Sequence, residues 1–198
     1  MPKDGQLWNN PAVLRIVYGI VTVLLLLILI GLALPRTHRV EVSTEIDAHQ
    51  ATVFALVNDF RRFTLWAPWR ATDPNARFLY SGPERGAGAT LTWDGTIIGS
   101  GTQTIVESRP YEYVGIVMNE DEAGEATSWF RLAPGVGTTI VHWGFERDHD
   151  LNIVGRYFAS LLGGIVARDY EAGLAGLKEL AESLPRADFS DLDIEHLV

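Results

Sequence analysis

One stretch near the end of the chain decides the fold: Ile153 to Leu184, which reads IVGRYFASLLGGIVARDYEAGLAGLKELAESL. Its apolar residues recur every three or four positions, which is the spacing of an amphipathic helix of about nine turns. A helix of this length must bury its apolar stripe against something large. The stretch therefore predicts a long closing helix that packs on the rest of the domain.

The apolar stripe of this helix changes direction half way along. At about 100° per residue, the stripe of residues 153–166 and that of residues 169–184 are offset by more than about a quarter turn. Gly163 and Gly164 stand where the two stripes join. We expect the second half to pack on a sheet as an ordinary amphipathic helix, and the first half, apolar around most of its circumference, to face a ligand or lipid. The two glycines are then a bend or hinge.

A second apolar segment lies near the amino terminus. Residues 16–34 read IVYGIVTVLLLLILIGLAL, about 19 residues without a charge, which is long enough to cross the hydrocarbon core of a bilayer as a helix. A cleaved signal peptide is the alternative interpretation. We expect a single-pass inner-membrane protein. Basic residues flank both ends of the segment, so their distribution does not decide on which side of the membrane the soluble domain lies. The periplasmic or outer side is favoured.

Composition excludes several classes of function. The net charge is −9, from 25 acidic and 16 basic residues, so a nucleic-acid backbone would be repelled. The chain has no cysteine, which excludes disulfides, thiolate nucleophiles and cysteine-bound zinc. Glu146, Asp148, His149 and Asp150 are metal-ligating residue types, but they lack a metal-site spacing, and Asp150 or Asn152 is better interpreted as the cap of the closing helix. The sequence calls for no metal or cofactor.

The region between the two apolar segments predicts one short helix or helix pair and an antiparallel sheet. The helical part follows Asp47, the expected N-cap, and ends near Trp69. Frequent turns then separate short β-prone runs, and Asp94-Gly95 carries the signal of a two-residue hairpin. The expected strands are residues 38–46, 76–80, 89–93, 97–108, 112–119, 126–133 and 137–146. Strand, short helices, sheet and long helix make an α+β domain in which the helix covers one face of a curved sheet.

Several motifs resemble the START-like superfamily, also called SRPBCC or polyketide cyclase/dehydrase-like. They are Ile46 to Phe60 (IDAHQATVFALVNDF), Phe63, Trp66-Ala67-Pro68-Trp69, Tyr80-Ser81-Gly82-Pro83, Gly86-x-Gly88, Thr92-Trp93, Thr138 to Trp143 and the closing helix. The resemblance covers roughly residues 38–184 and is close to the membrane-anchored bacterial members with an N-terminal span. One departure is His49, where such proteins commonly have proline.

The resemblance implies the helix-grip fold, in which a bent antiparallel sheet of about seven strands wraps around a long C-terminal helix. An apolar cavity lies between sheet and helix in this fold. Members bind lipids, quinones, sterols or aromatic polyketides, and a minority use the cavity for cyclase or hydrolase chemistry. The motifs are specific for the fold and say little about the chemistry.

Candidate ligand-binding residues follow from strand alternation and from the split helix. Alternation places Leu91 and Trp93 on the inner face of the sheet, together with Val141 and Trp143, and it turns His142 outward. Arg168 lies near the apolar stripe, where a charge needs a partner or a polar ligand group, although a solvated surface position is the alternative. The candidate ligand-binding residues are Trp93, Trp143, Tyr157, Phe158, Leu161, Leu162, Ile165 and Arg168. No catalytic residue is assigned.

These observations favour a membrane-anchored binding protein for an apolar small molecule: a lipid, a quinone or a polyketide-like compound. A cyclase- or hydrolase-like enzyme that uses the same cavity is the second hypothesis, and an assembly factor with a membrane-protein partner is the third. The expected organisation is an N-terminal tail (1–15), a transmembrane helix (16–34), the helix-grip domain (38–184) and an acidic, flexible tail (185–198).

Overall fold

A computed structural model describes residues 11–121 and 124–185 of the chain. The predicted acidic tail from Arg186 onward lies outside the described residues, as do the first ten residues of the predicted N-terminal tail. By its internal contacts the chain divides into two compact units. The first unit contains Met1–His38 and Asp148–Gly163, and the second contains Arg39–Arg147 and Gly164–Val198.

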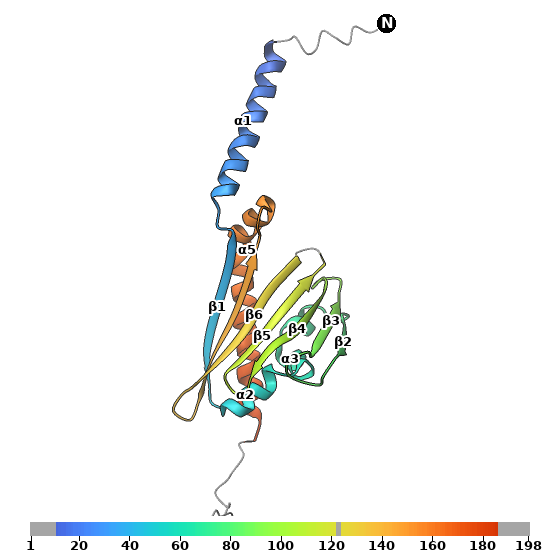
Figure 1. Cartoon of the computed structure of the whole chain (residues 1–198), viewed down its shortest axis with the longest axis vertical. Coiled ribbons are helices and arrows are strands. Elements are labelled where there is room, and N and C mark those ends of the chain that lie inside the picture. Colours follow the sequence, from blue (N-terminus) through green and yellow to red (C-terminus); the bar gives the residue numbers. More distant parts are fainter. Residues whose placement is uncertain (1–10, 122–123, 186–198) are drawn as a thin grey trace, which may run out of the picture. The chain divides into compact units, whose positions relative to one another are not determined.

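The secondary structure is that of an α+β protein (Figure 1). The elements in chain order are α1 (Pro11–Ala33), β1 (Thr37–Ile46), α2 (Gln50–Val57), α3 (Phe60–Trp66), α4 (Trp69–Thr72), β2 (Arg77–Ser81), β3 (Thr90–Asp94), β4 (Ser100–Arg109), β5 (Tyr113–Glu120), β6 (Gly124–Pro134), β7 (Thr139–Asp148) and α5 (Ile153–Ser183). All of the expected strands are present, within a few residues of their predicted ends.

The strands form one seven-stranded sheet in the order β1-β7-β6-β5-β4-β3-β2. Strands β2 to β7 make an antiparallel meander, so each strand pairs with its neighbour in sequence. The first strand returns to the far edge, beside β7. A register shift between Ile105 and Glu107 interrupts the pairing of β4 with β5, and such bulges bend a strand and increase its twist.

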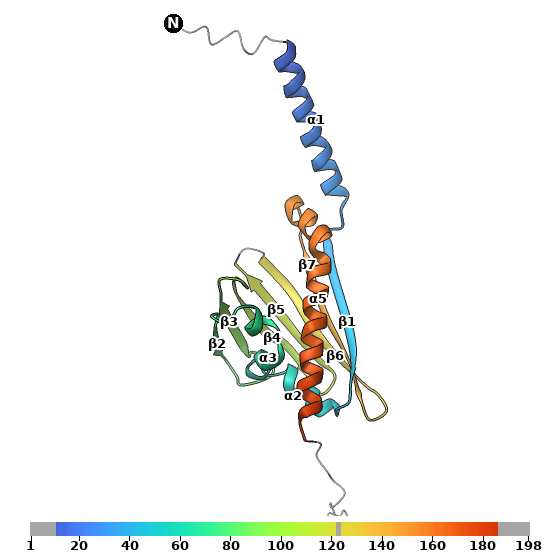
Figure 2. The same ribbon diagram turned by 180° about the vertical axis from the view of Figure 1, so that it is seen from behind.

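The predicted closing helix is present as α5, Ile153 to Ser183. The helix is not interrupted at Gly163 and Gly164, and a bend or hinge at these glycines stays a prediction. Figure 2 shows the second half of α5 lying across one face of the sheet, which we call the inner face. Its second half buries Tyr170, Leu174, Leu177 and Ala181, whose spacing of four, three and four residues is that of a single helical stripe. The predicted amphipathic packing of this half is confirmed.

The inner face carries an aromatic core. Strand alternation places Trp93 and Trp143 on it, and both are buried, as predicted. Trp143 stacks on Tyr170 of α5 with ring centroids 3.9 Å apart, and on Phe130 at 5.0 Å. Phe63 of α3 meets the edge of Trp143 at 6.0 Å. These rings join the sheet, the short helices and the second half of α5 into one core.

The predicted two-residue hairpin at Asp94-Gly95 is wrong. Strand β3 ends at Asp94 and β4 begins only at Ser100. The loop between them is closed by a hydrogen bond from Gly95 N to Gly99 O at 2.9 Å, and Gly99 has the positive φ of 67°. The reason is a tertiary contact, because the buried Asp73 side chain accepts a hydrogen bond from Ile97 N. The residues around Ile97, which were predicted to begin a strand, are therefore held beside the end of α4.

One of the two predicted helix caps is also wrong. Helix α2 begins at Gln50 with His49 at the N-cap position, and no side chain caps it there. Asp47 therefore lies too early to be the cap. At the start of α5, by contrast, Asn152 Oδ1 accepts a hydrogen bond from Gly155 N at 2.8 Å, which confirms Asn152 as the cap.

The first unit contains one N-terminal apolar helix. Helix α1 has a mean hydropathy of 2.9 over its most apolar window and is long and apolar enough to cross a membrane, by length and composition. A signal sequence near an amino terminus has the same properties. Helix α1 begins at Pro11, five residues before the predicted start at Ile16. The helix therefore extends beyond the uncharged segment at its amino-terminal end.

Two glycines of α5 make a matched test of its packing. A Cβ on Gly164 would meet nothing within 4 Å, whereas a Cβ on Gly176 would lie 2.5 Å from the backbone oxygen of Trp66. We expect Gly164→Ala to stabilise the protein by about 1 kcal/mol, the gain in helix propensity. We expect Gly176→Ala to destabilise the protein by about 1–3 kcal/mol, because the backbone of α5 or of Trp66 must move to make room for the methyl group.

Thermal unfolding of the full chain in detergent, followed by circular dichroism, measures both effects. A lower Tm for Gly164→Ala would contradict an uninterrupted helix at this position. An unchanged or higher Tm for Gly176→Ala would contradict the close approach of α5 to α3.

Candidate binding site

Five polar side chains gather on the otherwise apolar inner face of the sheet. We call them the inner polar cluster: Gln103, Glu120, Ser128, Arg147 and Tyr170. Gln103, Ser128 and Tyr170 are buried, and the other two are partly so. Four come from neighbouring strands β4 to β7 and the fifth from α5. Buried polar groups are costly unless they are paired, so the partners of each show what the cluster can do.

Strand register brings these residues together. Gln103 pairs with Met118, and Met118 pairs with Ala126 of the next strand. Glu120 lies two residues beyond Met118 on the same face, because side chains alternate along a strand. On β7, Arg147 continues the inward series of Trp143 and Phe145. The cluster therefore lies where the inward-facing apolar rows of four strands run out.

The charged members form an ion pair. Arg147 Nη2 donates to Glu120 Oε2 at 2.6 Å, and the two side chains are 14% and 32% exposed. The Arg147 guanidinium also lies over the Phe145 ring, 5.3 Å from its centroid. Its Nε is buried and has no hydrogen-bond partner among the described residues. Arg147 thus keeps one donor unused on the inner face.

The neutral members are linked to the aromatic core. Trp143 Nε1 donates to Ser128 Oγ at 3.0 Å, and Ser128 Oγ lies 3.4 Å from the Tyr170 hydroxyl. Ser128 itself donates to the carbonyl of Gly144 at 2.9 Å. Burial raises the pKa of Tyr170 well above its ordinary value of 10.0. Tyr170 is therefore a neutral phenol at physiological pH, able to donate a hydrogen bond but not to act as a base.

Gln103 is the least satisfied member of the cluster. The residue is 2% exposed, and its Nε2 has no hydrogen-bond partner among the described residues. Leaving a buried donor unpaired costs about 1–3 kcal/mol. Gln103 and Arg147 thus present two unused donors on the same inner face, an arrangement suited to a ligand with hydrogen-bond acceptors.

A cleft of about 540 Å³ adjoins the cluster. It is lined by the β3–β4 loop, Ser100, Glu120 and Asp121. Glu120 belongs to both the cleft and the cluster. Its strand partner Gly101 lies beneath the Trp93 indole, since a Cβ on Gly101 would approach that ring to 2.6 Å. The buried Trp93 indole therefore lies beside Gly101, the strand partner of Glu120.

Asp73 holds the loop that borders this cleft. Ile97 N donates to Asp73 Oδ2 at 2.8 Å. The backbone N–H of Ile97, helped by those of Ile98, Asn75 and Thr96, lowers the pKa of Asp73 from its ordinary value of 3.8, against the opposing effect of burial. The carboxylate form is thus the one that the fold prefers.

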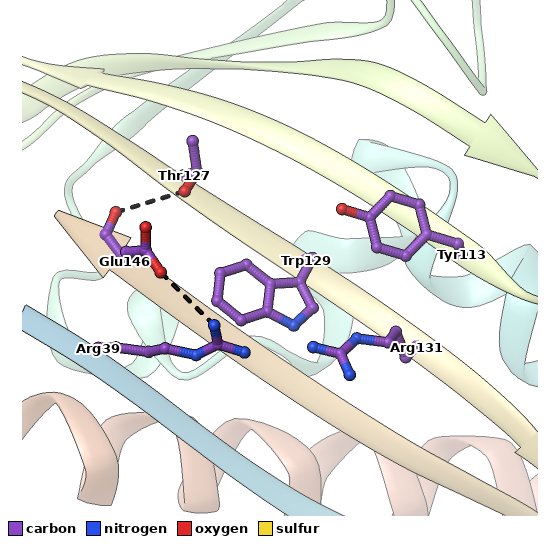
Figure 3. Close-up of a pocket in the computed structure, with 6 residues that line it drawn as sticks. All are labelled: Arg39, Tyr113, Thr127, Trp129, Arg131 and Glu146. Carbon is purple, nitrogen blue, oxygen red and sulfur yellow. Dashed lines mark hydrogen bonds and ion pairs between the residues drawn. The ribbon is translucent and has the colours of Figure 1, made fainter.

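The outer face of the sheet has a second, shallower depression of about 210 Å³ (Figure 3). The buried Trp129 indole lies there between the guanidinium groups of Arg39 and Arg131, 4.8 and 5.8 Å from its ring. Arg39 also pairs with Glu146 at 3.6 Å, and Arg131 with Glu41 at 3.2 Å. These charges neutralise one another and cover the indole, so the outer depression suits an apolar ligand less well than the inner face.

The structure separates the predicted ligand-binding residues into two groups. Trp93 and Trp143 lie on the inner face of the second unit. Tyr157 is half-buried in the first unit, and Phe158 and Leu161 are exposed there. The remaining members also lie on α5, where Ile165 and Arg168 are exposed and the side chain of Leu162 lies outside the description. A ligand-binding role for all eight stays a prediction, and Arg168 occupies the solvated position that was its alternative.

Sequence reasoning missed Gln103, Glu120 and Arg147. The signal that could have found them is strand alternation. Arg147 continues the inward series of Trp143 and Phe145 by one further step, and Glu120 does the same after Met118. Both fall near predicted strand ends, where the alternation is easily cut short.

The acidic and histidine residues after β7 have structural roles. Asp148 accepts a hydrogen bond from Arg36 Nε at 2.7 Å, and this bond lowers the pKa of Asp148. Asp150 lies 3.4 Å from the same guanidinium. Within residues 11–121 and 124–185, no group of three or more histidine and acidic residues is placed to hold a metal ion.

The sheet that grips α5 defines a helix-grip domain, and comparisons with known proteins agree. The sequence model of the family described as polyketide cyclase / dehydrase and lipid transport matches residues 37–182. The chain belongs to this family, as its START-like motifs predicted. A comparison with curated protein sequences gives no match.

Solved structures share the fold at low sequence identity. Truncated norcoclaurine synthase from Thalictrum flavum matches with a TM-score of 0.56 at 13% identity, over 75% of this chain and 96% of that one. The Aha1 dimer from Colwellia psychrerythraea gives 0.55 at 15% identity, over 73% and 96%. The di-domain ARO/CYC protein BexL from the BE-7585A biosynthetic pathway gives 0.56 at 17% identity, over 76% and 52%. At these identities the likeness establishes the fold alone.

The role of Asp73 can be tested by pH. Because its pKa is lowered in the folded protein, its carboxylate contributes stability above about pH 3.8, and this contribution is lost as pH falls through the lower, folded value. We expect Asp73→Asn to lower Tm by several degrees at neutral pH. The difference from the wild type should begin to shrink below about pH 3.8, where the carboxyl of the unfolded chain takes up a proton before that of the folded protein does.

Thermal unfolding between pH 3 and 7 measures this difference, with the exposed Glu84→Gln as the matched control. A Tm difference that stays constant with pH would show that Asp73 acts through shape and not through its charge.

Proposed function

We propose that this protein is a membrane-anchored binding protein for an apolar small molecule that carries a hydrogen-bond acceptor. The observation that supports this most directly is the pair of buried, unused donors on an apolar surface: Gln103 Nε2 and Arg147 Nε. Ligand pockets are typically apolar with a few placed polar groups, and the inner face has this composition.

The chemistry of the cluster narrows the ligand class. Gln103 and Arg147 offer N–H groups, so the matching ligand group is an oxygen acceptor such as a carbonyl, hydroxyl or carboxylate. Trp93 offers a flat apolar wall, which suits a ring or a long chain. A quinone, a lipid and a polyketide-like compound all combine these features. Family membership supports the same class of ligand.

Helix α1 supports the anchor. Its length and hydropathy are those of a membrane-spanning helix. Tethering a binding domain to a bilayer raises its effective concentration near ligands that partition there. We infer that α1 stays in the inner membrane as a single span and that the ligand is drawn from the lipid phase.

The binding proposal is tested by what purifies with the protein. The full chain is isolated in detergent, extracted with organic solvent and analysed by mass spectrometry. We expect one apolar species, enriched over an unrelated single-span protein prepared in parallel. Reproducible absence of such a species would overturn the proposal.

Gln103→Leu separates a ligand-binding role from a structural one. Leucine keeps the volume but removes the unused donor, so we expect the Tm of the ligand-free protein to stay the same or rise. Retention of the ligand should fall about tenfold, the value of one good hydrogen bond. Thr102→Val, the outward neighbour on β4, is the matched control and should change neither. Full retention together with a lower Tm would show that Gln103 serves the fold.

An enzyme is the second candidate, because a carboxylate and a phenol converge on the inner face. Glu120 is held beside Arg147, and the neutral Tyr170 phenol can donate a hydrogen bond, so the cluster offers a carboxylate base and a hydrogen-bond donor. The test compares the species extracted from wild type and from Glu120→Gln. If Glu120 is catalytic, the variant retains an unconverted compound of different mass. Identical masses in both extracts would exclude Glu120 as a catalytic base.

A further inference from the structure

The first half of α5 has an apolar surface that the described residues of its own unit leave exposed. Val154, Phe158 and Leu161 are 64%, 58% and 79% exposed. Their spacing of four and three residues places them on one side of the helix. Leu151, just before the helix, is also exposed. Large contiguous apolar surfaces of this kind mark an interaction site.

The segment that carries this surface has almost no charged residue to favour its exposure to water. Between Leu151 and Ala167 the only charged residue is Arg156, and it is 7% exposed. Its guanidinium faces main-chain carbonyls within the first unit: Nε donates to Asp150 O at 3.0 Å, and Nη1 donates to Leu32 O at 3.1 Å. The one charge is therefore turned inward and satisfied, and the exposed side of the helix is left apolar.

Contacts inside the first unit place the start of α5 beside the end of α1. Gly31 is buried against Ile153 and Tyr157. The Tyr157 hydroxyl donates to Leu27 O at 2.6 Å. Leu27 precedes the last residue of α1 by six positions, which is about 9 Å along a helix. Tyr157 therefore reaches well back along the apolar helix.

Helices α1 and α5 share an apolar groove and so form one continuous surface. A groove of about 330 Å³ lies between them, lined by Leu24, Leu27, Ile28, Ile153, Val154 and Tyr157. Its walls come equally from α1 and α5. Where α1 is embedded in lipid, Val154 on the rim of this groove is embedded with it. On the other side of Leu151 the charged groups begin at once, with Asp150 and the exposed Asp148–Arg36 pair.

We propose that the first half of α5, residues 153–163, is an interfacial membrane helix. It lies at the boundary of headgroups and acyl chains, with Leu151, Val154, Phe158 and Leu161 in the lipid. Interfacial helices bury an apolar face about 5–10 Å deep, which matches the reach of Tyr157 along α1. The inference rests on the proposed anchor, because α1 sets the depth. Phe158 and Leu161, two of the candidate ligand-binding residues, then contact lipid, which was the other expectation for this half of the helix.

The test uses single cysteines in the full chain, which has none of its own. Leu161→Cys and Leu151→Cys are labelled with an environment-sensitive fluorophore and reconstituted in vesicles of phosphatidylcholine and phosphatidylglycerol. Val23→Cys, within α1, reports on the span. Ala175→Cys, exposed on the second half of α5, is the matched control. Quenching by lipids with a nitroxide near the headgroup or deep in the acyl chain is measured for each.

We expect the labels at positions 161 and 151 to lose most of their emission to the shallow quencher, the label at position 23 to the deep quencher, and the label at position 175 to neither. Quenching at position 23 alone would overturn the interfacial helix and leave the anchor intact. No quenching at position 23 would overturn the anchor and, with it, this inference. Equal quenching at positions 161 and 175 would also overturn the inference, because the contact would not be specific to the first half.

Discussion

The close approach of α5 to the aromatic inner face is the constraint on which the second unit depends. Trp143 stacks on Tyr170 at 3.9 Å, and Gly173 faces the Trp143 ring so closely that a Cβ would lie 2.5 Å from it. One turn on, Gly176 leaves room for the Trp66 carbonyl. Stacked and edge-on rings at van der Waals distance contribute beyond their burial. Helix, sheet and short helices are therefore fixed by one set of aromatic contacts.

This packing also determines where polar groups collect. Ser128 is hydrogen-bonded to the Trp143 ring within the aromatic contacts, whereas Glu120 and Arg147 form an ion pair at the ends of the inward-facing series of β5 and β7. A partly buried ion pair adds little net stability, because desolvation offsets attraction. Gln103 Nε2 and Arg147 Nε have no hydrogen-bond partner in the part of the chain that the structure describes. An arrangement that serves stability so poorly is better explained by binding, as at other sites that depart from ideal packing.

The sequence predicted the fold well because its signals were local. Residue spacing alone shows the helical stripe of Tyr170, Leu174 and Leu177 and the strand alternation around Trp143. The turn after Asp94 was missed because its conformation depends on Asp73, which lies far away in sequence. For the same reason the inner polar cluster could be predicted only in part. Alternation shows which side chains face inward, but only the pairing of four strands shows that they meet.

A protein that takes an apolar ligand from a bilayer gains little from the hydrophobic effect, since the ligand leaves one apolar phase for another. Affinity and selectivity must then come from polar contacts that lipid does not offer. An acyl chain region has no hydrogen-bond donor, whereas the inner face presents Gln103 Nε2 and Arg147 Nε. A ligand acceptor that satisfies these donors removes their desolvation cost and gains its own partner. Under the proposed function, these two donors select the molecules that are retained from the many apolar compounds that the surrounding carbon surface accepts.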